Sequence, residues 1–522
     1  MMGHRSKQFK IFAPTTLESL VPGDSFYRVL ESKLDLSFVR DLTRDCYEQL
    51  GRPSIDPVVF FKLQLVLFFE GLRSERELVR TAADRLSVRW YLGYDFDEPL
   101  PDHSSLTRIR QRLGLATFDR FFERVVELCQ EAGLVWGKEL FIDATKVRAN
   151  ADVDSLVPRF YQQARQHLRE LFAEDGATAP VDDGPADLED PRAEPITGAD
   201  LCPERPEEAS SLAQENLATW KLLEEHRLDP GRAASAGYRR TSDFMVSTTD
   251  PDAVPMRARN GAEVRLGYHD HYVVDGGKAR IILKAFVTPA DVMENQAMVD
   301  LIRRARFRWQ LPVGRVVGDT AYGTAETIRA MEEQDIRAYV PLPDWETRTP
   351  YYGSGCFTYD TERDEYHCPQ GRSLQRRRTK YTERVVVYQA DAAGCNACPV
   401  KAACTASNHG RQVRRPFEAE YLDRVRAYHQ TALYGKMMRK RQVWVEPLFG
   451  EAKDWHGLRR FRLRTLWKVN VEALLTATGQ NLKRLLKSRG WSRRAWPTGA
   501  PSAAWPTTRR RVLLPFSLGP SW

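Results

Sequence analysis

Residues 139–145 have the sequence ELFIDAT, and this stretch decides how the fold is interpreted. Its apolar run is too short for a confident helix and has the composition of a strand buried inside a sheet. An acid, Asp143, interrupts the run and would project from the middle or the end of that strand. A second β-rich run, 313–319, ends in Asp319, and the following Gly323 and Thr324 predict a turn from strand to helix. The sequence therefore predicts two strands that each carry an acid.

A third acid opens the stretch 446–453, which has the sequence EPLFGEAK. Positions 446, 450 and 453 fall on one face of a helix, so Glu446 and Lys453 would face the same ligand. Pro447 has no amide donor, but a proline is well tolerated at the first position of a helix. We therefore expect a helix that begins near Glu446 rather than one that runs through it.

Three carboxylates in one pocket, Asp143, Asp319 and Glu446, would repel one another and resist ionising unless a cation shared the site. Hard oxygen ligands select Mg²⁺ or Mn²⁺. A pair of such ions about 3.5–4 Å apart stabilises the attacking and the leaving oxygen of an in-line phosphoryl displacement. The set indicates breakage and joining of DNA or RNA strands, although any one Asp at a strand end, taken alone, is more often a turn or cap residue.

Three blocks of the chain resemble the DDE transposases of bacterial insertion sequences: FIDATKVRAN at 141–150, GDTAYG at 318–323, and VEPLFG at 445–450 continuing to Lys453. The resemblance spans roughly residues 15–485. It implies a catalytic domain similar to ribonuclease H. In such a domain Asp143, Asp319 and Glu446 would bind two Mg²⁺ or Mn²⁺ ions, and Lys453 would contact a phosphate beside the cleaved bond.

The last of these blocks departs from the family at two positions. The family often has Tyr, Arg, Glu and Lys at fixed spacing, and the interval from Glu446 to Lys453 agrees with it. Gln442 stands where Arg is expected, and Arg439 stands where Tyr is expected. The departure leaves the metal ligands intact, and Arg441 or Arg439 could take the role of the missing Arg.

The resemblance implies a DNA transposase that cuts at the ends of its element and joins the freed ends to target DNA. Its partners would be the terminal inverted repeats and the target DNA, and cutting both ends implies a homodimer. Two other functions stay open. One is a DNA-binding repressor derived from a transposase, and the other is a ribonuclease H-like nuclease without strand transfer.

The composition fits a large enzyme that binds nucleic acid. The 522 residues suffice for two or three domains, and a net charge of +8 with a pI near 9.0 suits a polyanionic partner. The sequence has neither an apolar run of about 18 residues nor the apolar stretch of a signal peptide at its amino terminus. We therefore expect a cytoplasmic, nucleoid-associated protein with no membrane partner.

The order of the segments predicts an α/β fold with a mixed sheet. The resemblance implies that this sheet is ribonuclease H-like, with helices, two insertions and an all-α amino-terminal DNA-binding domain. We place the helix-turn-helix-like domain at 1–135 and the catalytic domain at 136–172, 237–342 and 416–488. An acidic insertion, 173–236, and a basic tail, 489–522, are expected to be disordered. Within the catalytic domain we expect paired strands at 264–275 and 280–288 and a helix at 294–308.

The amino-terminal region predicts short helices with tight turns. One helix would run from Val58 to Phe69, a capping-box pattern of Ser74 and Glu77 predicts a second, and a third would follow Asp102. Short helices with a basic last member are typical of helix-turn-helix readers, whose final helix enters the major groove. The same pattern also fits a packing or dimerisation module with its Arg side chains in solvent. The third helix carries three candidate DNA contacts, Arg108, Arg110 and Arg112.

The second insertion, 343–415, is rich in cysteine. The two-residue spacing of Cys395 and Cys398 lets both thiolates reach one Zn²⁺, and Cys368 and Cys404 would complete the four ligands of a structural site. Buried or redox-idle thiols are the competing interpretation, with His367 or His409 as substitute ligands.

Basic and aromatic residues are interleaved toward the carboxyl end of the chain. Basic residues neutralise phosphates, and aromatic rings can stack on unpaired bases, although such rings more often lie in a core. The candidate DNA contacts here are Arg439, Arg441, Arg459 and Arg460, with Trp444, Trp455, Phe461 and Trp467 among them.

Overall fold

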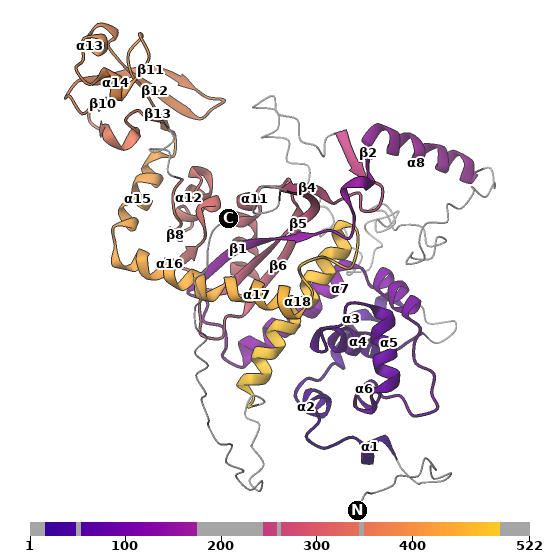
Figure 1. The fold of residues 1–522 in the computed structure, drawn as a ribbon. Coiled ribbons are helices and arrows are strands. Elements are labelled where there is room, and N and C mark those ends of the chain that lie inside the picture. Colours follow the sequence, from indigo (N-terminus) through magenta and orange to yellow (C-terminus); the bar gives the residue numbers. More distant parts are fainter. Residues whose placement is uncertain (1–15, 48–53, 175–243, 258–262, 344–348, 491–522) are drawn as a thin grey trace, which may run out of the picture.

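The structure is a computed structural model that describes residues 16–47, 54–174, 244–257, 263–343 and 349–490. The acidic insertion expected at 173–236 and the tail expected at 489–522 lie outside these residues except for their first two positions. In the described ranges the chain forms an amino-terminal group of helices, a central mixed sheet and a small separate sheet (Figure 1). No helix in these ranges is both long enough and apolar enough to cross a membrane.

The central sheet is built around β1, Glu139–Arg148, the strand that the stretch ELFIDAT predicted. β5, Val264–Asp275, pairs antiparallel along one side of β1, and β7, Arg315–Val317, pairs parallel along the other. The order of the sheet is β4-β5-β1-β7-β8, and β6 also pairs with β5. Both predicted strands are therefore confirmed and are neighbours, although β7 ends two residues before Asp319. The remaining strands are β4 at Val254–Arg257, β6 at Ile282–Pro289 and β8 at Arg337–Tyr339.

The register of β1 and β5 shows which of their side chains share one face of the sheet. Asp143 lies opposite Tyr272, and Thr145 lies opposite Asp270. Residues directly opposite each other in an antiparallel pair point to the same face, so these four side chains share one face. α17, Glu446–Trp455, packs on that face, because Phe449 stacks on Tyr272 with 4.4 Å between the ring centroids.

Helices connect the strands in the order that the sequence predicted. α11, Glu294–Arg308, has the predicted bounds and leads from β6 to β7. α12, Ala325–Glu332, then leads from β7 to β8. Beside the sheet, β2, Leu156–Pro158, pairs with β3, Met245–Ser247, and α8, Arg159–Glu174, follows β2. The carboxyl-terminal helices are α15 at Ala419–His429, α16 at Ala432–Trp444, α17 and α18 at Leu466–Ser488.

α18 covers the outer edge of β6. The amide of Asn481 accepts a 2.9 Å bond from the Ile282 N–H and donates a 2.8 Å bond to the Ile282 carbonyl. Asn470 makes the same pair of bonds to Val287, at 2.8 Å and 3.0 Å. An edge strand presents unpaired backbone groups, and burying them without partners is costly. Two asparagines of one helix thus allow β6 to lie against α18.

The amino-terminal helices include α4, Pro57–Phe69, with Asp56 as its amino-terminal cap, which confirms the first predicted helix. α5, Glu75–Asp84, begins directly after Ser74, but the Ser74 side chain makes no capping bond, so the predicted capping box is wrong. The other helices are α1 at Leu17–Leu20, α2 at Phe26–Lys33, α3 at Phe38–Thr43, α6 at Leu86–Leu92 and α7 at His103–Glu131.

One predicted DNA contact of α7, Arg110, lies in the core instead. It is 1% exposed and pairs with Glu75 of α5, which also accepts a 3.1 Å bond from Arg462. Burial raises the pKa of Glu75, but the charges of Arg110 and Arg462 outweigh burial, and the pKa lies below its ordinary value. A buried carboxylate needs such partners, which is why this Arg points inward. The prediction of Arg110 as a DNA contact is therefore wrong, whereas Arg108 and Arg112 are exposed.

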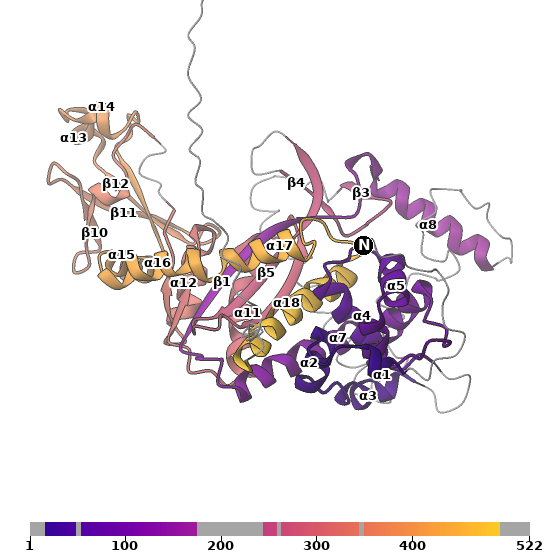
Figure 2. The same ribbon diagram turned by 60° about the horizontal axis from the view of Figure 1, so that its bottom comes forward.

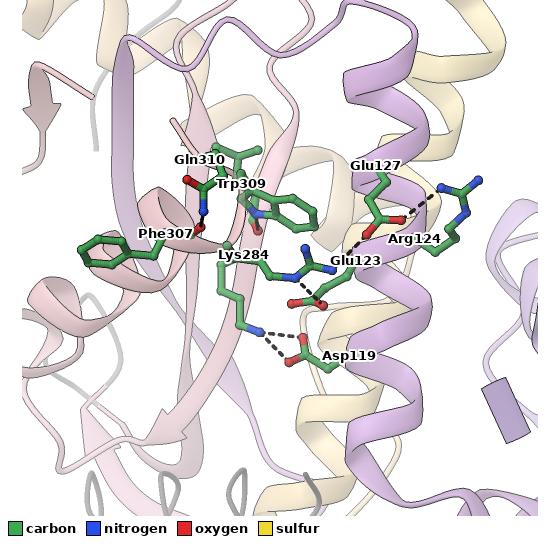
Figure 3. A network of polar contacts seen from close by, with 10 residues as sticks. Asp119, Glu123, Arg124, Glu127, Lys284, Phe307, Trp309 and Gln310 are labelled. Atoms are coloured by element: carbon green, nitrogen blue, oxygen red, sulfur yellow. Dashed lines mark hydrogen bonds and ion pairs between the residues drawn. The ribbon is translucent and has the colours of Figure 1, made fainter. Parts of the chain in front are cut away.

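Ion pairs fasten α7 to the central sheet and to α11. Lys284 of β6 pairs with Asp119 of α7 at 2.6 Å, and Arg308 of α11 pairs with Glu123 and Glu127 at 2.9 Å each (Figure 3). The buried apolar side chains of the amino-terminal helices and of the sheet form one contiguous core. The helical region is therefore continuous with the central sheet rather than loosely tethered to it.

The Cys-rich insertion forms a second sheet with strand order β13-β12-β11-β10-β9. It has a small hydrophobic core of its own and projects from the rest of the chain in both views (Figures 1 and 2). Its elements are β9 at Thr358–Asp360, β10 at Glu365–His367, β11 at Ser373–Lys380, β12 at Val385–Ala390, α13 at Ala392–Asn396, α14 at Lys401–Cys404 and β13 at Gln412–Pro416.

Candidate active site

Asp143 lies near the middle of β1, where the strand separates from β7. Pairing with β7 ends at Phe141, whereas pairing with β5 continues to Arg148, so the sheet opens on one side at Asp143. The side chain is buried, and burial raises the pKa of Asp143 to about 6, while Arg441 opposes the rise and Asp319 adds to it. A nearby cation strongly stabilises the ionised form of a carboxyl group in such a buried position.

Asp319 and Glu446 approach Asp143 from two other elements. Asp319 follows β7 by two residues and begins the short 3₁₀ turn Thr320–Tyr322, where its Oδ1 accepts a 2.9 Å bond from the amide of Ala321. Glu446 is the first residue of α17, as the position of Pro447 predicted. Its side chain is 54% exposed, so this acid is open to solvent.

The guanidinium group of Arg441, from α16, lies among the three acids. Its Nη2 is 3.2 Å from Oδ1 of Asp143 and 3.8 Å from Oδ2 of Asp319. Its Nη1 is 3.9 Å from Oε1 of Glu446. One planar cation therefore contacts all three carboxylates, so the structure brings together the acids that the sequence singled out. Arg441 balances their charge in this arrangement, and a contact with DNA stays a prediction for it.

Lys453 lies on the same side of the sheet, about two helical turns along α17 from Glu446. Its Nζ donates a 2.5 Å hydrogen bond to Oγ1 of Thr145. Thr145 and Asp143 are two residues apart on β1 and therefore point to the same face of the sheet. The bond to Thr145 thus holds Lys453 on the face that carries Asp143. The position agrees with a Lys that faces the same ligand as Glu446.

The sequence analysis missed a fourth acid, Glu294, at the start of α11. Burial raises the pKa of Glu294 to about 7, and the negative charges of Asp319 and Asp143 add to the rise. β6 runs in the same direction as β1, because both are antiparallel to β5, so α11 begins on the side of the sheet where β1 and β7 end. A Glu in the first turn of a helix is common and carries no signal by itself. Only the strand topology places Glu294 at the site.

A second missed acid, Asp270, lies on β5 opposite Thr145 and is fully buried. Neither of its carboxyl oxygens has a hydrogen-bond partner within the described ranges. Burial raises the pKa of Asp270 well above its ordinary value, and the charge of Lys453 opposes the rise. An isolated buried carboxyl keeps its proton rather than carry an uncompensated charge. Asp270 thus lies on the same face of the sheet as Asp143, in an environment that favours its protonated form.

α17 is held in position from α18. Glu451 of α17 accepts a 2.5 Å bond from Lys483 and a 3.3 Å bond from Arg484. Burial raises the pKa of Glu451, but the hydrogen bonds and charges of its cationic partners outweigh burial and lower the pKa. The ion pairs therefore fix the helix that presents Glu446 and Lys453.

The donor set of the pocket fits a divalent metal ion. Carboxylate oxygens are hard ligands that suit Mg²⁺ or Mn²⁺, and the raised pKa values of Asp143 and Glu294 indicate that the pocket needs positive charge. Arg441 lies between the acids and keeps their oxygens apart. In the described part of the chain, the one set of three residues whose ligand atoms all lie within 4.8 Å of one another is Asp360, Glu365 and His367, on β9 and β10 of the separate sheet.

The other predicted DNA contacts are accessible. Arg439 on α16 is exposed, and so are Arg459 and Arg460, although Arg460 also donates a 2.8 Å bond to Asn150. Trp455 at the end of α17 is 73% exposed, whereas Phe461 and Trp467 are buried. Of these aromatic rings, Trp455 alone is free to stack on a base.

Two family models match the chain. Residues 15–112 match the model described as Transposase domain (DUF772), and residues 367–486 match the model described as Transposase DDE domain. The second match contains Glu446, Arg441 and Lys453, whereas Asp143 and Asp319 lie outside both. No curated protein and no solved structure matches the chain. The resemblance to DDE transposases is confirmed, and the two matched domains indicate a transposase.

Proposed function

We propose that this chain uses divalent metal ions to cut DNA at the ends of its element and to join the freed ends to target DNA. The observation that carries the proposal is the convergence of Asp143, Asp319 and Glu446 on one cation, Arg441. These acids come from a strand, a loop after a second strand and the first residue of a helix. Like charges gathered in this way lower the stability of the fold. A catalytic requirement for the three acids would explain why they are nevertheless gathered.

The arrangement of the sheet supports a catalytic core of the ribonuclease H type. β1 is central, β5 lies antiparallel on one side with β6 beyond it, and β7 and β8 lie parallel on the other side. Asp143 lies where β1 separates from β7, and Asp319 lies just beyond the carboxyl end of β7, the side of an α/β sheet at which ligands generally bind.

Each residue of the pocket has a role in this proposal. Asp143 and Asp319 hold the metal ions, and Glu446 completes the second of the two metal sites. Bound ions would lower the pKa of a water molecule and stabilise the attacking and leaving oxygens. Lys453, positioned by Thr145, binds a phosphate oxygen beside the cleaved bond.

The reaction has two displacements at phosphorus. Water attacks the phosphodiester at the element's end, the bond from phosphorus to the 3′ oxygen breaks, and the element keeps a free 3′ hydroxyl group. This hydroxyl group then attacks a phosphodiester of the target DNA and displaces the 3′ oxygen of the target. Two ends must be processed together, so we propose that the active form is a homodimer bound to both terminal repeats.

The test is cleavage and joining of a supercoiled plasmid that carries the terminal repeats of the chain's own element, with Mg²⁺ present. We compare the unaltered protein with Asp143→Asn, Asp319→Asn and Glu446→Gln. Asp335→Asn, an exposed surface acid before β8, is the matched control. Binding to the repeats is measured in parallel, so that loss of chemistry is separated from loss of binding.

We expect the unaltered protein and the Asp335 variant to cut and join, and the three acid variants to bind the repeats without cutting. Variants that cut as well as the unaltered protein would refute the assigned site. Binding without cutting by every protein would favour the repressor, and cut ends that are never joined would favour the nuclease without strand transfer.

A further inference from the structure

The hydrophobic core of the Cys-rich insertion is too small to stabilise its folded structure by packing alone. Its separate core consists of six buried side chains: Phe357, Tyr366, Leu374, Tyr388, Ala390 and Val413. Modules of this size rarely obtain enough stability from a core of that kind, and they commonly use disulfides or a structural metal. None of the cysteines in the described ranges forms a disulfide.

Four of these cysteines line one cavity. Cys368 follows β10, Cys395 belongs to α13, Cys398 lies in the turn after α13, and Cys404 ends α14. The cavity has a volume of about 20 Å³, which is room for a single atom or ion. Cys356 does not contribute to its lining and is exposed. The chain thus brings four thiols from three separate segments to one small space.

The backbone around Cys368 is arranged to support a thiolate. The amide of Arg372 points at the Cys368 sulfur, with 3.4 Å between nitrogen and sulfur, and the amide of Gly371 bonds to the Cys368 carbonyl at 2.8 Å. Gly371 has a φ of +71°, a conformation that side chains other than glycine rarely adopt. Amide hydrogen bonds to a ligating sulfur stabilise its charged form and fix its direction.

A second tight turn presents the thiols of Cys395 and Cys398. The amide of Cys398 bonds to the Cys395 carbonyl at 3.2 Å, so the two thiols leave one short turn. Burial raises the pKa of the Cys404 thiol, Arg411 opposes the rise, and the charges of Cys395, Cys368 and Cys398 add to it. The other three thiols therefore lie within electrostatic reach of Cys404, in keeping with the single cavity that all four line.

We propose that Cys368, Cys395, Cys398 and Cys404 bind one Zn²⁺ in a structural site of the insertion. Four thiolates form a closed tetrahedral shell with no position for water, so the site serves folding rather than catalysis. No three of the described sulfurs lie mutually within 4.8 Å. A tetrahedral site brings sulfurs to about 3.8 Å from one another, so binding draws the two turns together.

The contacts around the cavity explain what the metal ion stabilises. The amide of Tyr352 bonds to the carbonyl of Ala403 in α14 at 2.8 Å. Arg411, just before β13, donates to the carbonyls of Tyr352 and Cys404 at 2.6 Å and 2.9 Å. The first segment of the insertion, α14 and the start of β13 therefore meet beside the four cysteines. α13 and α14 lie at the end of the insertion away from α15 (Figures 1 and 2), so the zinc site is independent of the proposed catalytic function.

The experiment measures zinc in the full-length protein purified without chelators, using plasma mass spectrometry. We expect one zinc per chain in the unaltered protein and loss of zinc in Cys368→Ser and Cys398→Ser. Cys356→Ser, an exposed cysteine of the same insertion, should keep the metal, and so should His367→Ala. Protein grown with Co²⁺ should show the sulfur-to-cobalt charge-transfer absorption of a tetrahedral thiolate site.

A measurement on the unaltered protein covers the case in which the variants fail to fold. Titration with an organomercurial reagent should release zinc in step with the modification of four thiols. The inference is overturned by an absence of zinc with all thiols free, by a mass two hydrogens lower that indicates a disulfide, or by loss of zinc in the His367 variant alone. None of these results depends on whether the protein cuts DNA.

Discussion

Arg441 supplies the positive charge of the pocket in this structure, and a metal ion would compete with it for the same acids. We predict that Arg441→Gln destabilises the metal-free protein by on the order of 3 kcal/mol, because the buried Asp143 and the partly buried Asp319 lose a shared cation. Mg²⁺ should then raise the unfolding temperature of the variant more than that of the unaltered protein. Thermal unfolding in EDTA and in Mg²⁺ measures both effects.

Arg439 provides the control for this experiment, because it lies on α16 but is exposed. Arg439→Gln should leave the unfolding temperature and its response to Mg²⁺ unchanged, since surface substitutions change stability by about 0.5 kcal/mol or less. An equal response of Arg441→Gln and the unaltered protein to Mg²⁺ would mean that the guanidinium group and the metal ion do not share the acids.

Asp270 should make stability depend on pH in a definite direction. Its folded pKa lies well above 3.8, so the folded state holds a proton that the unfolded chain releases above that pH. Stability is therefore lost as the pH rises above 3.8, at up to about 1.4 kcal/mol per pH unit until the raised pKa is reached. Asp270→Asn removes this dependence on pH. The free energy of unfolding measured with urea should therefore exceed that of the unaltered protein by an amount that grows from pH 5 to pH 8. Parallel curves would instead indicate an Asp270 that is ionised and paired with Lys453.

At the scale of elements, Glu75 links three segments that lie far apart in the chain. It takes its partners from α7 and from the loop before α18, through Arg110 and Arg462. We predict that Arg110→Ala lowers the free energy of unfolding by about 3–5 kcal/mol, because the buried carboxylate of Glu75 keeps only one of its two cationic partners. Arg108→Ala, two residues away on the same helix but exposed, should cost about 0.5 kcal/mol or less. Chemical denaturation of both variants measures the difference, and similar losses would mean that Glu75 is not the reason that Arg110 is buried.

The two asparagines of α18 should protect β6 from opening. Asn481→Ala leaves the buried N–H and carbonyl of Ile282 unpaired, at a cost of about 1–3 kcal/mol for each group. We expect the amide of Ile282 to exchange with deuterium markedly faster in this variant, while amides of β1 keep their protection. The comparison needs hydrogen exchange at residue resolution. An unchanged Ile282 amide would show that water or another group replaces the asparagine.

The same elements show what the sequence could predict. β1, the bounds of α11 and the start of α17 follow from local signals: an apolar run, helical periodicity and a proline at the first helical position. Glu294 and Asp270 could not be found in this way, because their importance arises from strand order and register. Arg110 was misjudged for a related reason. A basic stripe on a helix looks the same whether it faces solvent or a buried acid on another helix.

At the scale of the whole molecule, the separate sheet carries positive charge at a distance from the candidate active site. Arg376, Arg377 and Arg378 follow one another on β11, and all three are exposed. The register of β11 with β12 shifts between Arg376 and Arg378, which indicates a β-bulge at Arg377. A bulge redirects side chains that would otherwise alternate between faces. Arg376 forms an ion pair with Asp364 at 3.2 Å.

We predict that Arg377 and Arg378 bind DNA phosphates when the insertion meets the duplex. The double variant Arg377→Ala with Arg378→Ala should weaken binding about equally for all sequences, and the slope of log affinity against log salt should fall by about 2. Arg303→Ala with Lys487→Ala removes the same charge from exposed positions on α11 and α18 and is the control. Fluorescence anisotropy at several salt concentrations gives both slopes. Equal slopes in the two double variants would mean that net charge alone, rather than contact through β11, governs the affinity.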